Sequence, residues 1–138
     1  MSKLSINLFL LIIFIIYFPI GVWAIFDSVL ISKNFLSTSF TNVVGLEIIS
    51  DLGKSEIAGL YGGINLVLGI LAFSAIFFNS LKLFIIKVMI LITSSIALGR
   101  FISSFLPDMP TFLNSYFLFE IIIALWGFFL VKTLNQST

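Results

Sequence analysis

Four long apolar stretches, separated by short polar segments, constrain this chain more than any other feature of its sequence. The first, residues 4–31, is interrupted only by Pro19 and Gly21 and carries one acid, Asp27, near its end. A helix needs about 20 apolar residues to cross a hydrocarbon core about 30 Å thick. Only 9% of the 138 residues are charged and 60% are hydrophobic, which is not the composition of a soluble domain. We therefore predict an all-α integral membrane protein.

The breakers and charges between these stretches predict one transmembrane domain, residues 1–138, that is a four-helix up-down bundle. Ser55 is a suitable N-cap for the second helix, and Glu56 would lie in its first turn, where an acid is favourable. Asn79 and Ser80 predict a tight turn, and short connections make consecutive helices antiparallel neighbours. The predicted helices are residues 4–31, 56–78, 81–106 and 111–134, with an interfacial loop and a short amphipathic turn in residues 32–55.

A signal peptide is the alternative interpretation of the first stretch. Lys3 precedes it, and Val22, Trp23 and Ala24 approximate a small-residue cleavage site. The apolar core of a signal peptide has about 7–15 residues. Residues 4–31 are far longer, which favours a membrane span.

Basic residues near the helix ends set the expected orientation, because cytoplasmic ends carry an excess of Lys and Arg. With the N-terminus inside, four lysines fall on the inner side, and three basic residues and all six acids fall in the outer half or the loops. We expect cytoplasmic termini, a bacterial inner membrane location, and polar chemistry in the outer half. The inner residues are Lys3, Lys82, Lys87 and Lys132, and the outer ones are Lys33, Lys54 and Arg100.

The absence of both Cys and His removes several classes of chemistry. It excludes disulfides, Cys/His zinc sites, haem held by either residue, and catalysis by His. The net charge is +1 with no polybasic run, which argues against a nucleic-acid partner. We expect no cofactor and no metal site.

Arg100 and Glu120 are the ionisable residues that matter most, because charged groups inside membrane spans are costly and mark functional sites by default. At 1.5 Å per residue, Arg100 would lie about 10 Å from Pro107 and Glu120 about 15 Å from Pro110. Both would approach the membrane middle from the same side.

Helical spacing places polar and small side chains on one face of each of the last two helices. The face of the third helix holds Thr93, Ala97, Arg100, Ser103 and Ser104. The face of the fourth holds Tyr116, Glu120, Ala124 and Gly127. If the two faces meet, Arg100 pairs with Glu120, and Tyr116 or a serine satisfies the remaining guanidinium donors.

Asp27 of the first helix and Glu56 of the second would reach the same outer region of the membrane as Arg100 and Glu120. Asp108 would lie at the rim of this region. Such an excess of acid would leave one carboxylate protonated or free to meet a cationic ligand. Two structural alternatives stay open: the pair of Arg100 and Glu120 is only an interhelical clamp, and Glu56 only caps its helix. The predicted ligand-binding residues are Asp27, Glu56, Tyr61, Arg100, Ser103, Asp108, Tyr116 and Glu120.

The second helix is rich in small residues, and Gly59 and Gly63 form a G-x-x-x-G motif. Small residues let helix backbones approach closely in a membrane, so these positions predict helix packing. Asn65 lies about 180° from Glu56 on the helix, which favours an interhelical hydrogen bond over a place beside Glu56. The predicted packing residues are Gly59, Gly62, Gly63, Asn65 and Gly69.

Three stretches in order, SEIAGLYGGINLVLGI, IALGRFISSFLPDMP and FEIIIALWG, resemble a known family. They are similar to the bacterial small membrane proteins known as domain of unknown function 4345, over about residue 45 to the end. That family carries an E-x-R-A-x-Y-G-G-x-x-L-x-L-G stretch, an L-G-R-x-x-S stretch followed by Asp, Gly and Pro, and a Glu in the last helix. The matching positions here are Glu56, Tyr61, Gly62, Gly63, Gly99, Arg100, Ser103, Asp108, Pro110 and Glu120.

This chain departs from the family pattern at two places. Ala58 and Gly59 replace the usual Arg and Ala, which removes a cation, and Met109 replaces a Gly. The resemblance implies a four-helix membrane bundle and brings no established activity. A distant relation to the DoxX-like four-helix membrane proteins is an analogy of fold and implies no function.

The sequence leaves three functions open. The first is a non-enzymatic membrane protein with a polar, acid-rich outer cavity that binds or passes a small polar, cationic or lipid-headgroup ligand. The second is an accessory or assembly subunit that docks a membrane-protein partner or a second copy through the Gly59 and Gly63 face. The third, an intramembrane lipid-modifying enzyme with Glu120 as acid or base, is disfavoured because His, Cys and a metal-ligand set are missing.

Overall fold

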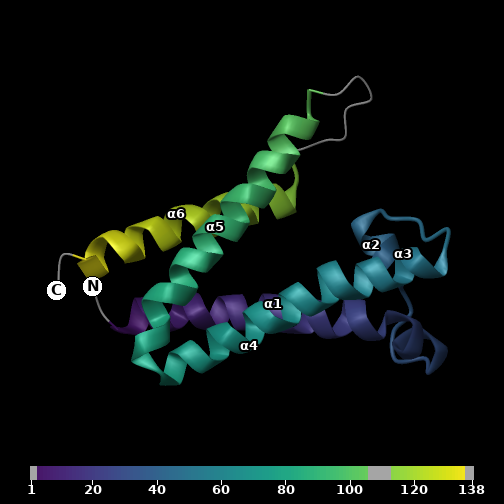
Figure 1. Ribbon diagram of the computed structural model, residues 1–138, viewed down its shortest axis with the longest axis horizontal. Coiled ribbons are helices and arrows are strands. Elements are labelled where there is room, and N and C mark those ends of the chain that lie inside the picture. The colour runs from purple at the N-terminus through teal and green to yellow at the C-terminus, as the bar shows by residue number, and fades with distance from the viewer. Residues whose placement is uncertain (1–2, 106–112, 136–138) are drawn as a thin grey trace. The chain divides into compact units, whose positions relative to one another are not determined.

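The computed structural model describes residues 3–105 and 113–135, and these residues form helices and no strand. Four helices are long and apolar enough to cross a membrane (Figure 1). The predicted all-α chain with four long apolar helices is therefore confirmed. The four are α1 (Lys3–Ser32), the run Asp51–Phe77, α5 (Asn79–Ser103), and Ser115–Leu134 within α6 (Ser115–Asn135).

The chain divides into two compact units, each containing one pair of long helices. The α1–α4 unit is Leu10–Phe77, and the α5–α6 unit is Met1–Phe9 together with Phe78–Thr138. Helix α1 contributes to both units, because the boundary between them falls inside it.

The second apolar helix begins at Asp51, five residues before the predicted start at residue 56. The reason is that Ser50 caps this helix: its Oγ accepts a hydrogen bond from the backbone N of Gly53 at 3.1 Å. The predicted cap, Ser55, lies inside the helix instead. The run continues without a break as α3 (Asp51–Glu56), the π-helical η1 (Ile57–Gly63) and α4 (Ile64–Phe77).

The connection between α4 and α5 is a single residue, Phe78, with extended backbone angles (φ −107°, ψ 101°). The predicted turn at Asn79 and Ser80 is wrong, because both residues already belong to α5. The backbone N of Leu81 donates to the carbonyl of Phe78 at 3.0 Å, which closes the first turn of α5.

Helix α5 ends at Ser103 rather than at residue 106, and α6 begins at Ser115 rather than at residue 111. Asn114 precedes α6, and its Oδ1 accepts from the backbone N of Phe117 at 3.0 Å. This is the geometry of an N-cap, which satisfies a backbone donor that the helix itself leaves free.

In the α1–α4 unit, α1 runs antiparallel to η1 and α4. Residue numbers rise along α1 while those of the contacted residues in η1 and α4 fall. The contact needs glycine. A Cβ at Gly69 would lie 2.7 Å from the backbone N of Phe18, and one at Gly21 would lie 2.6 Å from Cα of Leu66. The contacting pairs are Phe14 with Phe73, Phe18 with Gly69, Gly21 with Leu66, and Ile25 with Gly62.

The predicted loop 32–55 contains the short helix α2 (Phe40–Val44) and the start of α3, both in the α1–α4 unit. Phe40 and Thr41 at the start of α2 are buried, whereas Val43 is exposed. The ring of Phe40 meets the ring of Trp23 of α1 edge-on, with centroids 5.6 Å apart. This apolar contact holds the loop to its own unit.

In the α5–α6 unit, α5 and α6 pack along their length, and the first turns of α1 join the core. Phe9 meets Trp126 edge-to-face, with ring centroids 5.3 Å apart. A Cβ at Gly127 would lie 2.6 Å from Cγ1 of Ile90, so glycine lets α6 approach α5 at this point. Side chains with no exposed surface are Phe9, Ile85, Ile86, Met89, Thr93 and Leu130.

Candidate functional site

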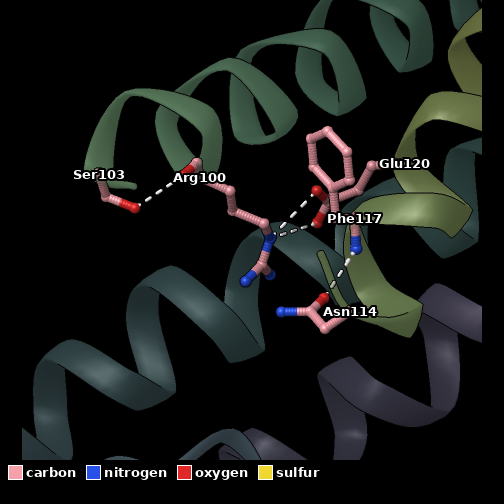
Figure 2. A network of polar contacts seen from close by, with 5 residues as sticks. All are labelled: Arg100, Ser103, Asn114, Phe117 and Glu120. Atoms are coloured by element: carbon pink, nitrogen blue, oxygen red, sulfur yellow. Dashed lines mark hydrogen bonds and ion pairs between the residues drawn. The ribbon is translucent and has the colours of Figure 1, made fainter. Parts of the chain in front are cut away.

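Arg100 of α5 and Glu120 of α6 form the ion pair that the sequence predicts (Figure 2). Nε of Arg100 lies 3.1 Å from Oε1 and 3.1 Å from Oε2 of Glu120. The Glu120 side chain is 8% exposed, whereas the Arg100 side chain is 37% exposed. The pair therefore combines an enclosed carboxylate with a guanidinium that is partly open.

The two Nη nitrogens of Arg100 point away from Glu120 (Figure 2). Both carboxylate oxygens bond to Nε, so the end of the guanidinium that carries four N–H donors is not used by Glu120. Within residues 3–105 and 113–135, no acceptor is hydrogen-bonded to either Nη. This end of Arg100 is the part of the site with spare hydrogen-bonding capacity.

The two serines predicted to assist Arg100 bond elsewhere. Ser103 Oγ donates to the carbonyl of Arg100 at 2.8 Å, and Ser104 Oγ donates to the carbonyl of Phe101 at 2.6 Å. The expectation that a serine satisfies the guanidinium is therefore wrong, because a carbonyl of the serine's own helix lies three residues back and takes the proton. Tyr116 approaches Arg100 with its ring, whose centroid is 5.8 Å from Cζ.

The two predicted helix faces meet. On α5, Thr93 and Ala97 are buried on the same face as Arg100, and on α6, Ala124 and Gly127 are buried beside Glu120. Thr93 Oγ1 donates to the carbonyl of Met89 at 2.7 Å, so its hydroxyl is satisfied within its own helix. Among the residues that the structure describes, the guanidinium of Arg100 is thus the one group of the α5 polar stripe that bonds across to α6.

The pair lies closer to the helix ends than the sequence predicts. Arg100 is three residues before the end of α5 at Ser103, which is about 5 Å along the axis. Glu120 is five residues into α6, which begins at Ser115, or about 8 Å along its axis. The predicted depths of about 10 Å and 15 Å are distances from Pro107 and Pro110, which lie outside the described residues.

Asp27 belongs to the α1–α4 unit and bonds to the loop of that unit. Its Oδ2 accepts from Ser39 Oγ at 2.7 Å, and its Oδ1 accepts from the backbone N of Phe40 at 2.8 Å. Ser39 Oγ also lies 2.7 Å from Thr41 Oγ1. Both carboxylate oxygens are therefore engaged at the start of α2, a use that differs from the predicted ligand role.

Glu56 and Tyr61 also belong to the α1–α4 unit. Glu56 is exposed and ends α3, so the predicted place in the first turn of its helix is wrong, because the helix begins at Asp51. The Tyr61 ring meets the Phe40 ring with centroids 5.7 Å apart. The remaining predicted ligand residue, Asp108, lies outside the described residues.

The predicted packing glycines divide into two groups. Gly62 and Gly69 lie against α1, as their blocked Cβ positions show. Gly59 has nothing within 4 Å of a Cβ, and Gly63 has only the carbonyl of Ala58 at 3.9 Å. Asn65, expected to bond across helices, donates from Nδ2 to the carbonyl of Tyr61 in its own helix run instead.

One shallow open groove is found in each unit. The groove of the α1–α4 unit, about 380 Å³, is lined by Gly59, Gly63, Ile64, Val67 and Leu68. The groove of the α5–α6 unit, about 390 Å³, is lined by Ser5, Leu125, Trp126 and Phe129. Both are apolar, and neither is lined by a predicted ligand-binding residue. Within the described ranges, no group of three or more acids is placed to hold a metal ion.

Sequence reasoning missed Gly21 and the partners of Asp27. Gly21 was noted only as an interruption, although a small residue inside an apolar span is itself a packing signal. Ser39 and the backbone of Phe40 carry no such signal, because 12 and 13 residues separate them from Asp27.

Comparisons of this chain with protein-family models, curated proteins and solved structures find no match in any of the three. The geometry of the two units is therefore the basis for the function proposed below.

Proposed function

We propose that this chain is a non-enzymatic, four-span membrane protein that binds a lipid head group or a similar small polar ligand at Arg100. The observation that carries the proposal is the form of the ion pair. Glu120 holds Arg100 through Nε and leaves the Nη end partly exposed and without an acceptor in the described parts of the chain. A pair that served only as a clamp would gain a second, parallel hydrogen bond by using an Nη donor as well, and this pair does not.

The position of Arg100 along α5 supports a head group as the ligand. Helix α5 has 25 residues and is about 37 Å long, which exceeds a hydrocarbon core of about 30 Å. The last turn of a helix of this length reaches the level of the lipid head groups. Arg100 lies in that last turn.

The state of the acids argues against a cationic ligand. Asp27 uses both oxygens for its own loop, and Glu120 uses both for Arg100. A cation bound in an acid-rich cavity would have to compete with these hydrogen bonds for the carboxylate oxygens. At the ion pair, the donors without a partner in the described residues belong to Arg100, which favours a ligand with oxygen acceptors there.

The proposal includes a topology and a family. We propose an up-down bundle with cytoplasmic termini in a bacterial inner membrane, on the distribution of Lys and Arg. Membership of the family known as domain of unknown function 4345 is proposed on the ordered motifs around Tyr61, Arg100 and Glu120.

Native mass spectrometry of the protein, gently released from its own membrane, tests the proposal. Wild type is expected to carry a lipid or small-molecule adduct. The double variant Arg100→Gln/Glu120→Gln, which keeps a neutral hydrogen-bonding pair, is expected to lose it with its helical circular dichroism unchanged. Lys87→Gln, which removes an exposed cation from the same helix, is the matched control and is expected to keep the adduct. Absence of an adduct from wild type, or its retention by the double variant, contradicts the proposal.

A second candidate function is that of an accessory subunit, and one observation favours it. Gly59 and Gly63 line an apolar groove with no side chain over their Cβ positions, although they form a helix-packing motif. Co-release of a protein in the same spectra, lost in Gly59→Leu and retained in the Arg100→Gln/Glu120→Gln variant, would favour this function over ligand binding.

A further inference from the structure

The guanidinium of Arg100 has a free side with a defined shape. A guanidinium presents five N–H donors in one plane, and Glu120 accepts only from the Nε edge. The two Nη nitrogens point away from that carboxylate (Figure 2). A planar pair of parallel donors matches an acceptor that offers two oxygens from one atom.

From this geometry we infer that the Nη pair of Arg100 binds the phosphate oxygens of a membrane phospholipid. The inference rests on the proposed function and specifies its ligand class. Phosphate and carboxylate both fit a bidentate arrangement with a guanidinium. The phosphate is favoured because Arg100 lies in the last turn of α5, at head-group level in a helix of 25 residues.

The surroundings of Arg100 support a bound oxyanion. Glu120 fixes the guanidinium from the far edge with two 3.1 Å contacts, so little side-chain freedom remains to be lost on binding. The Tyr116 ring is half exposed, and its centroid lies 5.8 Å from Cζ of Arg100, within the range of a cation–π contact. A charge-assisted hydrogen bond is stronger in such a partly buried setting than in bulk water.

The role of Glu120 separates an oxyanion ligand from a cationic one. If the ligand is a phosphate, Glu120 positions Arg100 and does not touch the ligand, so a neutral glutamine at position 120 leaves the binding charge in place. If the ligand is a cation, the negative charge of Glu120 is indispensable. Glu120→Gln therefore gives opposite results for the two ligand classes.

The experiment is native mass spectrometry of the full chain in detergent micelles with phosphatidylglycerol or with diacylglycerol of the same acyl chains. Wild type is expected to retain phosphatidylglycerol at least about tenfold better, the effect of one charge-assisted hydrogen-bond pair. Lys87→Gln is expected to keep this preference, and Glu120→Gln is expected to keep most of it, because its amide oxygen still accepts from Nε and holds Arg100 in place. Arg100→Lys, which keeps the charge but lacks the planar pair of donors, and Arg100→Gln/Glu120→Gln are expected to lose most of it.

Three outcomes would overturn the inference. Equal retention of the two lipids by wild type would leave a lipid site without phosphate recognition, so the proposed function would stand and the inference would fail. Loss of binding in Glu120→Gln, with binding kept by Arg100→Lys, would assign the site to a cation. Retention of neither lipid would refute both proposals.

A competition experiment distinguishes a bound phospholipid from bound inorganic phosphate as the ligand of Arg100. Inorganic phosphate at millimolar concentration is expected to leave phosphatidylglycerol bound, because the acyl chains add apolar contacts that the free ion lacks. Displacement of the lipid by inorganic phosphate would assign the Nη pair to the free ion instead.

Discussion

The two helix pairs of this chain are held together differently. In the α1–α4 unit, glycines let backbones meet: a Cβ at Gly69 would lie 2.7 Å from the backbone of Phe18. In the α5–α6 unit, Gly127 also lets the helices approach, and an ion pair joins Arg100 to Glu120 in addition. This difference determines where hydrogen-bonding groups can remain available for a ligand. Glycine packing has no polar group left over, whereas an ion pair used from one edge leaves donors for a ligand.

The largest effect is expected from breaking the ion pair on the acid side. Glu120→Leu would leave Arg100 without its partner beside apolar side chains, and removal of one partner of a buried pair costs about 3–5 kcal/mol of unfolding free energy. Reversible unfolding in mixed detergent micelles measures this loss. Glu120→Gln is the control and should lose less, because its amide oxygen still accepts from Nε. A stability of Glu120→Leu equal to wild type would show that the pair does not hold the helices.

The next largest effect concerns the glycine contact. Gly69→Ala places a methyl group against the backbone of Phe18, and overpacking of this kind costs about 1–3 kcal/mol. The same unfolding measurement detects it. Gly59→Ala in the same helix run is the matched control and should be neutral or slightly stabilising, because nothing lies near its Cβ. Equal losses in the two variants would mean that Gly59 is also packed.

A smaller effect is expected at the loop of the α1–α4 unit. Asp27→Asn keeps one acceptor oxygen but loses the other, which removes about 1 kcal/mol of hydrogen bonding at the start of α2. Phe40 of the loop packs against the Trp23 ring. A loosened loop would expose this ring, so acrylamide should quench the fluorescence of Trp23 more strongly in the variant. The measurement needs a Trp126→Phe background, in which Trp23 is the single tryptophan. Unchanged quenching would argue that Phe40 alone holds the loop.

The smallest effect is expected at Tyr116. Tyr116→Leu keeps an apolar side chain but removes the ring from the guanidinium, and an exposed contact of this type contributes about 0.5–1 kcal/mol. Lipid binding should weaken slightly in the mass spectra while the preference for phosphatidylglycerol remains. Loss of the preference would make Tyr116 part of phosphate recognition.

The parts of the fold that follow from local patterns were predictable. Four apolar stretches predict four long helices, and spacing of three and four residues places Arg100 and Glu120 each on the polar face of its own helix. The helix starts were less predictable, because several residues near each start can serve as caps. Ser50 and Ser55 are both suitable N-caps by type, and only the backbone conformation selects Ser50.

The sequence by itself determined the class of protein, the four apolar helices and the face on which each polar side chain lies, because these depend on composition and on the helical repeat. The tertiary structure decided which neighbour each face meets. Gly59 and Gly69 are equivalent as small residues in the sequence, yet α1 lies against Gly69 and leaves Gly59 open. Asp27 and Glu120 are equivalent as isolated acids, yet one bonds to its own loop and the other to Arg100. A local pattern sets the direction of a side chain, whereas packing of distant segments sets its partner.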